Sequence, residues 1–410
     1  MLLYENKKAK LLNILKFGIN PFKKFVSTGE IKEDLEFTSS RNELVNTLSE
    51  TIKTNNNFIL PIIGGVGTGK THLYWILRSG LYRHNTVYIS LETGSKRCFY
   101  NMYSNYIETL ELEPLRNTIN HLCNEWGALE RKYGFFHVVN IDKVRNNALH
   151  KLSRHFKDNE QVALRDVING ITTHQLDPYK RVDAERWLLG ELMDVREIAR
   201  LNLQNDLRKN KNAYVMLKLL IENARKGTVI FIDDFEKLIA MLKPPEDEEE
   251  EKIFDPSWLY GSESSPDHVE ARKVLKKIMK LLSIKGMKVV ITLKSMDALE
   301  EIKNIIRDID ENFVQSFLDP LFLLKLSEDD ILEFYIKNME HFLTSINLYD
   351  FYDEIPEKYF PLNEIVLKRI YKNTDGNPRE IIKMLIKIFN DIIFSEEELE
   401  NVLFKYERSL

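Results

Sequence analysis

Four short apolar segments of the chain are typical of buried β-strands. They are rich in Val, Ile and Phe, lack alternating polar residues, and cover residues 58–63, 86–91, 228–233 and 287–293. Uninterrupted apolar runs indicate strands buried on both faces, as in a parallel sheet covered by helices. Pro61 disfavours the first of these strands because proline has no backbone N–H to donate. The pattern as a whole predicts an α/β fold.

Helical spacing of apolar residues marks the N-terminal part of the chain. Residues 1–24 predict a short basic amphipathic helix that docks on the next domain, with a nucleic-acid-binding arm as the alternative. Residues 38–53 predict a second helix, whose start can be capped by Thr38, Ser39 or Ser40.

The second and third strands are separated by far more residues than a crossover helix needs. Helical spacing recurs there, for example over 186–203, so we predict a large helical insertion at about 95–226. Later in the chain, residues 243–266 contain an unbroken acidic run at 246–251. Adjacent like charges repel, which predicts a solvated disordered loop, with a tether for a basic partner as the alternative.

The C-terminal part of the chain also has helical signals. Ser327 followed by Asp330 is a capping signal, and a last helix is expected from about Pro378 to Ile393. We therefore divide the chain into an N-terminal segment (1–37), a core (38–326), a helical lid (327–394) and a short charged tail (395–410).

Composition narrows the classes of protein. The 410 residues are 43% hydrophobic and 30% charged, which excludes wholesale disorder and a disulfide scaffold. No apolar run approaches 18 residues, and only two cysteines occur, so we expect no membrane partner and a cytoplasmic location. The formal net charge of −5 gives no global attraction to DNA, so DNA contact would need a local patch. Two lysine- and arginine-rich helix faces are candidates, or are simply solvated: Lys276, Lys277 and Lys280, and Arg145, Lys151, Arg154 and Lys157.

The strongest chemical signal is the sequence GGVGTGKT at 64–71. It matches G-x-x-x-x-G-K-[ST], follows an apolar run and precedes a predicted helix. A glycine-rich turn and a helix N-terminus present converging N–H groups to phosphate oxygens. Lys70 would contact the β- and γ-phosphates, and the Thr71 hydroxyl would ligate Mg²⁺. The predicted nucleotide-binding residues are Gly64, Gly65, Val66, Gly67, Thr68, Gly69, Lys70, Thr71 and His72.

Two acidic residues, Asp233 and Asp234, end the third predicted strand. The carboxyl ends of strands are where open α/β sheets bind ligands. We expect Asp233 to hold Mg²⁺, through water, and Asp234 to polarise the attacking water.

Two further segments offer candidates for contact with the γ-phosphate. The fourth predicted strand ends near Thr292, Lys294 and Ser295, any of which could reach the phosphate or the water. Asn377 is a good cap for the helix at Pro378, which puts Arg379 in the first turn. The helix dipole disfavours a cation there, and a bound phosphate would reverse that effect.

Taken together, these segments resemble the AAA+ ATPases, and more narrowly the archaeal initiator type related to origin-recognition and helicase-loader ATPases. The matching segments are GINPF (18–22), SSRNEL (39–44), GGVGTGKT, FIDDFEK (231–237), VVITLKSMDAL (289–299) and GNPREI (376–381). A weaker similarity links DAERWLLGEL (183–192) to ATP-binding proteins of BREX-type phage-defence systems.

The resemblance implies a P-loop NTPase core with a C-terminal lid, and ATP and Mg²⁺ as cofactors. It assigns Lys70 and Thr71 to Walker A, and Asp233 and Asp234 to Walker B. Lys294 falls at sensor 1, with Thr292 an alternative, and Arg379 at sensor 2.

The chain departs from the family in three places. Asp234 stands where the family usually has Glu, and Lys294 stands where Asn or Thr is usual. Residues 310–322, where an arginine finger is expected, contain no Arg, and the nearest is Arg307. An arginine finger is worth about 10³–10⁵ in rate in related phosphoryl transfers, so its loss predicts slow turnover.

Three functions remain open. The first is an oligomeric ATPase that acts as a switch or loader on DNA or on DNA-bound protein. The second is an ATP-locked adaptor that binds a protein partner, for example in a defence or transposition complex. A RecA-like translocase ranks below both, because the lid and its GNPR helix start suit AAA+ better.

Overall fold

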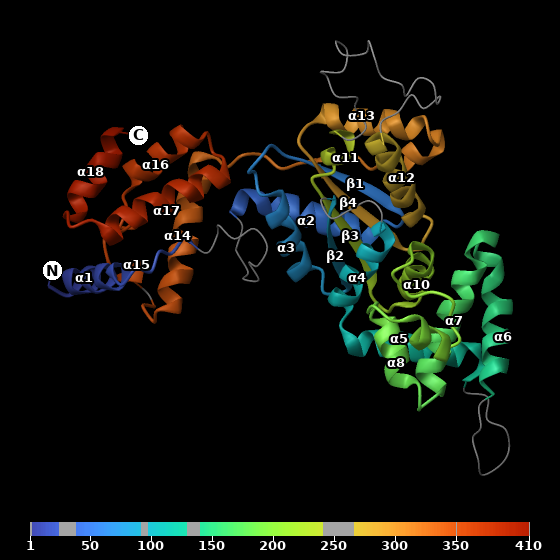
Figure 1. Ribbon diagram of the computed structural model, residues 1–410. Helices are drawn as coiled ribbons and strands as arrows, with labels where there is room; N and C mark the ends of the chain where they lie inside the picture. The colour runs from blue at the N-terminus through green and yellow to red at the C-terminus, as the bar shows by residue number, and fades with distance from the viewer. Residues whose placement is uncertain are drawn as a thin grey trace, which may run out of the picture. The chain divides into compact units, whose positions relative to one another are not determined.

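Five strands form one parallel sheet in the order β2-β3-β4-β1-β5 (Figure 1). Every residue of β1 and β4 is buried, which explains why their sequences lack polar alternation. The expected α/β fold, with a helix-flanked parallel sheet, a helical insertion and C-terminal helices, is confirmed. The strands are β1 (Phe58–Ile63), β2 (His84–Ser90), β3 (Gly227–Asp233), β4 (Met287–Leu293) and β5 (Leu321–Phe322).

Pro61 lies inside β1, and the hydrogen bonds of that strand explain why it is tolerated. The carbonyls of Ile59 and Ile63 accept from Leu318 and Leu323 on the β5 side. Pro61 shares their orientation because strand residues alternate with a period of two. Its missing N–H therefore faces the side where the partner strand is only two residues long.

The structure is a computed structural model that describes residues 2–23, 38–91, 97–128, 140–240, 266–349 and 351–409. It divides into two units, which are described separately. The first holds residues 1–53, 62–80 and 320–410, and the second holds 54–61 and 81–319. Residues 243–265 of the predicted acidic loop lie outside the described residues.

The second unit contains strands of the sheet and the helical insertion that links β2 to β3 (Figure 1). The insertion helices are α4 (Cys98–Leu110), α5 (Leu112–Cys123), α6 (Ile141–Leu152), α7 (Gln161–Leu176), α8 (Arg181–Leu188), α9 (Val195–Arg200) and α10 (Asn210–Asn223). Helices α7 and α8 pack closely, since a Cβ on Gly170 would lie 2.5 Å from the Trp187 ring. Three more helices follow: α11 (Glu236–Ala240), α12 (Pro266–Leu281) and α13 (Met296–Arg307).

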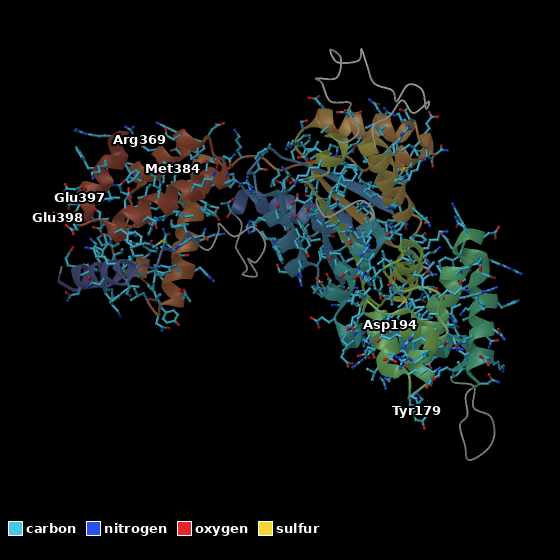
Figure 2. The ribbon with its side chains drawn as sticks, in the orientation of Figure 1. Tyr179, Asp194, Arg369, Met384, Glu397 and Glu398 are labelled. Carbon is cyan, nitrogen blue, oxygen red and sulfur yellow. The ribbon has the colours of Figure 1, made fainter. Side chains whose placement is uncertain are left out.

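The helical spacing over 186–203 corresponds to two helices, α8 and α9, rather than one. Gly190 has φ +76°, which an uninterrupted helix does not allow. The side chain of Asp194 then accepts from the N–H groups of Arg196 and Glu197, in a capping box that starts α9. Figure 2 labels Asp194. It also labels Tyr179, which lies before α8 and is 99% exposed.

The first unit contains a helical group built from both ends of the chain. Leu11, Leu15 and Phe22 are fully buried in one apolar core with the C-terminal helices. The amphipathic helix expected at the N-terminus is therefore present, and it packs on the C-terminal helices rather than on the domain that follows it. The group consists of α1 (Leu2–Lys16), α14 (Glu328–Ser345), α15 (Phe351–Glu354), α16 (Glu364–Thr374), α17 (Pro378–Phe394) and α18 (Leu399–Ser409).

Most of the segment expected to be a charged tail is helical. Helix α18 buries Val402 and Tyr406 in the same core, and Leu399 and Leu403 pack against it. Their spacing is that of one helix face, a signal that the high charge of 395–410 obscures. The capping box of Ser327 and Asp330 is confirmed at the start of α14.

Two general features bear on location and redox state. Among the described residues, no helix is long and apolar enough to cross a membrane. Cys98 and Cys123 are buried free thiols, and burial raises their pKa values to about 11 and about 12. Both thiols are therefore protonated at neutral pH and are poor nucleophiles.

Candidate functional site

The glycine-rich loop joins β1 to α3 (Lys70–Gly80) in the first unit. Lys70 is only 7% exposed, and its Nζ donates to the carbonyls of Gly64 at 2.7 Å and Gly65 at 3.2 Å. Gly67 and Gly69 have φ values of +81° and +100°, which favour glycine. The loop therefore wraps around a buried ammonium group, the arrangement needed to meet an anion with both a charge and backbone N–H groups.

Arg41, on helix α2 (Ser39–Thr54), adds a second cation beside this loop. Its guanidinium is buried and donates to the carbonyl of Thr68 at 2.9 Å and to that of Leu324 at 2.8 Å. Burial lowers its pKa to about 10, partly opposed by the charge of Asp330. Arg41 therefore stays protonated at neutral pH and links the glycine-rich loop to the segment after β5.

The start of α17 packs directly on the glycine-rich loop. The side chain of Asn377 donates to the Val66 carbonyl at 2.9 Å and accepts from the Arg379 N–H at 3.1 Å. That same N–H also lies 3.3 Å from the Gly67 carbonyl. The predicted cap at Asn377 is confirmed, and Arg379 begins beside the loop with its side chain exposed.

The acidic residues belong to the second unit. Asp233, at the end of β3, is 5% exposed, and its carboxylate accepts hydrogen bonds. The donors are the Thr292 hydroxyl at 2.6 Å, the Tyr88 hydroxyl at 2.9 Å and the Asp234 N–H at 3.1 Å. These hydrogen bonds hold the Asp233 carboxylate in a fixed orientation at the end of β3.

Asp234 has a different environment. Its backbone is left-handed, with φ +49°, and its N–H donates to the Thr292 hydroxyl at 2.9 Å. Its side chain is 43% exposed and lies 3.2 Å from the Nζ of Lys237. The carboxylate expected to orient water is therefore ion-paired with a lysine of its own turn.

The three candidates near the end of β4 differ in what they can reach, and Ser295 caps α13 by accepting from the Ala298 N–H. Thr292 is completely buried and is occupied by Asp233 and Asp234. Lys294 is 56% exposed, and its Nζ lies 3.6 Å from a carboxylate oxygen of Glu236. Of Thr292 and Lys294, the lysine is thus the one with freedom to move toward a ligand.

The structure brings the predicted residues together in two sets. The first unit joins the glycine-rich loop to the backbone of Arg379, and places Thr71 and His72 in the first turn of α3. The second unit joins Asp233, Asp234 and Thr292, with Lys294 nearby. Sequence reasoning missed Arg41, Tyr88 and Glu236 as members of these sets, although Arg41 and Glu236 lie inside the SSRNEL and FIDDFEK segments.

No metal centre is built from protein ligands alone in the described part of the chain, where no three His, Cys, Asp or Glu residues gather. Mg²⁺ prefers oxygen ligands such as the hydroxyl of Thr71 in the first unit and the carboxylate of Asp233 in the second, which stay predicted ligands. That ion usually takes only one or two protein ligands and completes its shell with phosphate and water.

Several of the basic residues considered for DNA contact form ion pairs or hydrogen bonds with other residues of the chain. Lys280 pairs with Glu160, and its Nζ sits 3.7 Å from the centre of the Tyr214 ring. Arg145 donates to the hydroxyls of Thr172 and Thr173. Lys151 lies 3.2 Å from Glu125. Lys280 lies on α12, and Arg145 and Lys151 lie on α6, so each of the two basic faces has residues that pair with other parts of the chain.

No protein-family model matches the chain, and no curated protein matches it significantly.

Proposed function

We propose that the protein is a Mg²⁺-dependent, ATP-binding AAA+ ATPase that acts as an oligomeric, nucleotide-driven switch or loader on DNA or DNA-bound protein complexes. The observation that carries this proposal is the glycine-rich loop closed around the buried ammonium of Lys70, with α17 hydrogen-bonded to it. The loop and α3 would take the phosphates.

The side chains around the proposed site have distinct roles. Lys70 and Arg379 would stabilise negative charge on the phosphates, Thr71 and Asp233 would hold Mg²⁺, and Asp234 would position water. Magnesium, when bound, would neutralise charge on the β- and γ-phosphates.

The hydrogen bonds between α17 and the loop support a switch. Asn377 and Arg379 contact the carbonyls of Val66 and Gly67, so a ligand that shifts the loop also shifts the start of α17. We propose that α14 to α18 act as a lid that closes on ATP and relaxes after hydrolysis, which changes the surface offered to partners.

A second function, an ATP-locked adaptor with little turnover, is favoured by the ion pair between Asp234 and Lys237. A carboxylate drawn toward a lysine is poorly placed for water, and a misplacement of about 1 Å can cost on the order of 100-fold in rate.

Calorimetry with ATP and ADP in the presence of Mg²⁺ tests nucleotide binding. We expect Lys70→Ala to weaken ATP binding by about 10- to 100-fold, because it removes charge-assisted hydrogen bonds to the phosphates. Lys53→Ala, on the exposed face of α2, is the control and should bind as the wild type does. Failure of the folded wild type to bind either nucleotide would overturn the proposal.

Steady-state phosphate release, with and without duplex DNA, separates the two functions. Turnover that DNA stimulates supports the switch or loader, and tight ATP binding without release supports the adaptor.

Asp234→Glu tests whether the short carboxylate limits the rate. We expect phosphate release to rise, since the longer side chain extends the carboxylate by one methylene. The left-handed backbone favours Asp over Glu, so we also expect a loss of about 1 kcal/mol in the free energy of unfolding. Measuring both quantities separates a rate effect from a stability effect, and an unchanged rate in folded protein would contradict the prediction.

A further inference from the structure

Glu236, three residues after Asp233, is a buried carboxylate with unused hydrogen-bonding capacity. Its side chain is 11% exposed, and neither oxygen accepts a hydrogen bond from any residue that the structure describes. The Nζ of Lys294 lies 3.6 Å from one oxygen, which is close enough for charge attraction but too long for a strong hydrogen bond.

The other two carboxylates of the segment FIDDFEK are differently engaged. Asp233 accepts hydrogen bonds from Thr292, Tyr88 and the Asp234 N–H, and Asp234 is half-exposed beside Lys237. Burying a carboxylate without hydrogen bonds is costly, so the charge of Lys294 is the main described compensation for Glu236. Lys294, in turn, is drawn toward Glu236 and away from other anions.

Both residues stand where a parallel sheet binds ligands. Glu236 begins α11 just after β3, and Lys294 is the first residue after β4. Strands β3 and β4 are neighbours and parallel, so these positions share the carboxyl edge of the sheet. The half-exposed lysine can turn toward a ligand at this edge, whereas the buried carboxylate stays in place.

We propose that Glu236 is a specificity-determining residue, which sets how strongly the protein distinguishes a nucleoside triphosphate from a diphosphate. Glu236 competes with the γ-phosphate for the ammonium of Lys294. A triphosphate must draw Lys294 away from Glu236, whereas a diphosphate has no third phosphate to do so. This inference rests on the proposed function, since it requires ATP at the site.

The competition predicts opposite effects for the two residues. Glu236→Gln removes the competing charge and should tighten binding of a non-hydrolysable ATP analogue by about three- to tenfold, with ADP affinity unchanged. Lys294→Met should weaken binding of the analogue by a similar factor, also without effect on ADP. The double variant should match Lys294→Met, because Glu236 acts only through the lysine.

The experiment is calorimetry of the full chain with adenylyl imidodiphosphate and with ADP, both with Mg²⁺. Glu50→Gln and Lys53→Met provide a matched control pair, since these residues form an exposed ion pair 2.9 Å long on α2. The analogue-to-ADP affinity ratio of the controls should equal that of the wild type.

The possible results distinguish this inference from the proposed function. Binding of both nucleotides with an unchanged affinity ratio in Glu236→Gln overturns the role of Glu236 and leaves ATP binding intact. If the wild type binds neither nucleotide, both proposals fail. Should Glu236→Gln not fold, Lys294→Met alters only a half-exposed side chain, and an unchanged ratio there also overturns the inference.

Discussion

His72 shows how the charge state of one residue depends on a distant part of the chain. It follows Thr71 in the first turn of α3, and burial lowers its pKa to about 4, with a further contribution from the charge of Arg41. At neutral pH its imidazole is therefore uncharged, and the positive charges of this region come from Lys70 and Arg41.

The lowered pKa of His72 predicts a loss of stability in mild acid. An unfolded chain binds a proton at His72 below about pH 6.5, whereas the folded chain does so only near pH 4. The free energy of unfolding should therefore fall as the pH decreases from 6.5 to 4, by about 2 kcal/mol at pH 5. Urea unfolding of the wild type and His72→Gln at pH 7 and pH 5 measures this. The variant should lose less stability than the wild type, and equal losses would contradict the prediction.

The sequence identifies His72 only by its place after the phosphate-loop motif. Its charge state depends on burial first and on the charge of Arg41 second, and both arise from tertiary packing, which leaves no mark on the local pattern. The same holds for Tyr88, a strand residue that donates to Asp233. Motif spacing predicts which residues stand near the phosphates, but not which neighbours set their protonation and orientation.

The contact between the glycine-rich loop and α17 depends on the absence of a side chain at Gly67. A Cβ there would lie 2.5 Å from the Asn377 Oδ1, and φ at this position is +81°. At Gly65 a Cβ would meet only Thr68, at 3.7 Å. Two glycines of one motif therefore have different structural requirements.

We predict that Gly67→Ala lowers the free energy of unfolding in the absence of nucleotide by about 1–3 kcal/mol, because both backbone strain and a clash result. Gly65→Ala, the matched control, should change it by no more than about 1 kcal/mol. Urea unfolding of the two variants gives the comparison. Equal losses would show that the contact between Gly67 and Asn377 does not contribute to stability.

At the scale of elements, the sequence predicts helix caps, which depend on neighbouring residues, but not hydrogen bonds between residues far apart in the chain. The caps at Ser327 and Asn377 follow from neighbouring residues, and both are present. The bond from Asn377 to Val66 joins residues 311 positions apart, and no pattern in one sequence records it. Strand β5, with two residues, is too short for its apolar pattern to be recognised.

The predicted metal ligands Thr71 and Asp233 are tested by calorimetry, which measures Mg²⁺-dependent nucleotide binding to variants of these residues.

At the scale of the whole molecule, the N-terminal residues complete an apolar core that the C-terminal helices mainly form. Phe22 is fully buried, with its ring centre 6.0 Å from that of Tyr335 and 5.2 Å from that of Phe389. Asn20 fixes the same segment by donating to the Ile386 carbonyl and the Asn390 side chain. The GINPF segment thus joins α1 to α17.

This packing predicts a large difference between two nearby phenylalanines. Phe22→Ala should lower the free energy of unfolding by about 3–5 kcal/mol, because it removes a buried ring and leaves a cavity. Phe17→Ala should have an effect of no more than about 0.5 kcal/mol, since Phe17 is 84% exposed. Urea unfolding measures both, and similar values for the two variants would contradict the assignment of the N-terminal segment to the C-terminal core.

The shared core also has a consequence for how the protein is made. Leu11, Leu15 and Phe22 leave the ribosome roughly 360 to 380 residues before Ile381 and Phe389, with which they form one core. At about 5–20 residues per second, the apolar face of α1 waits on the order of tens of seconds for its partners. Nascent chains would therefore benefit from a chaperone at this helix, and translation must pass α17 before the N-terminal segment can fold into place.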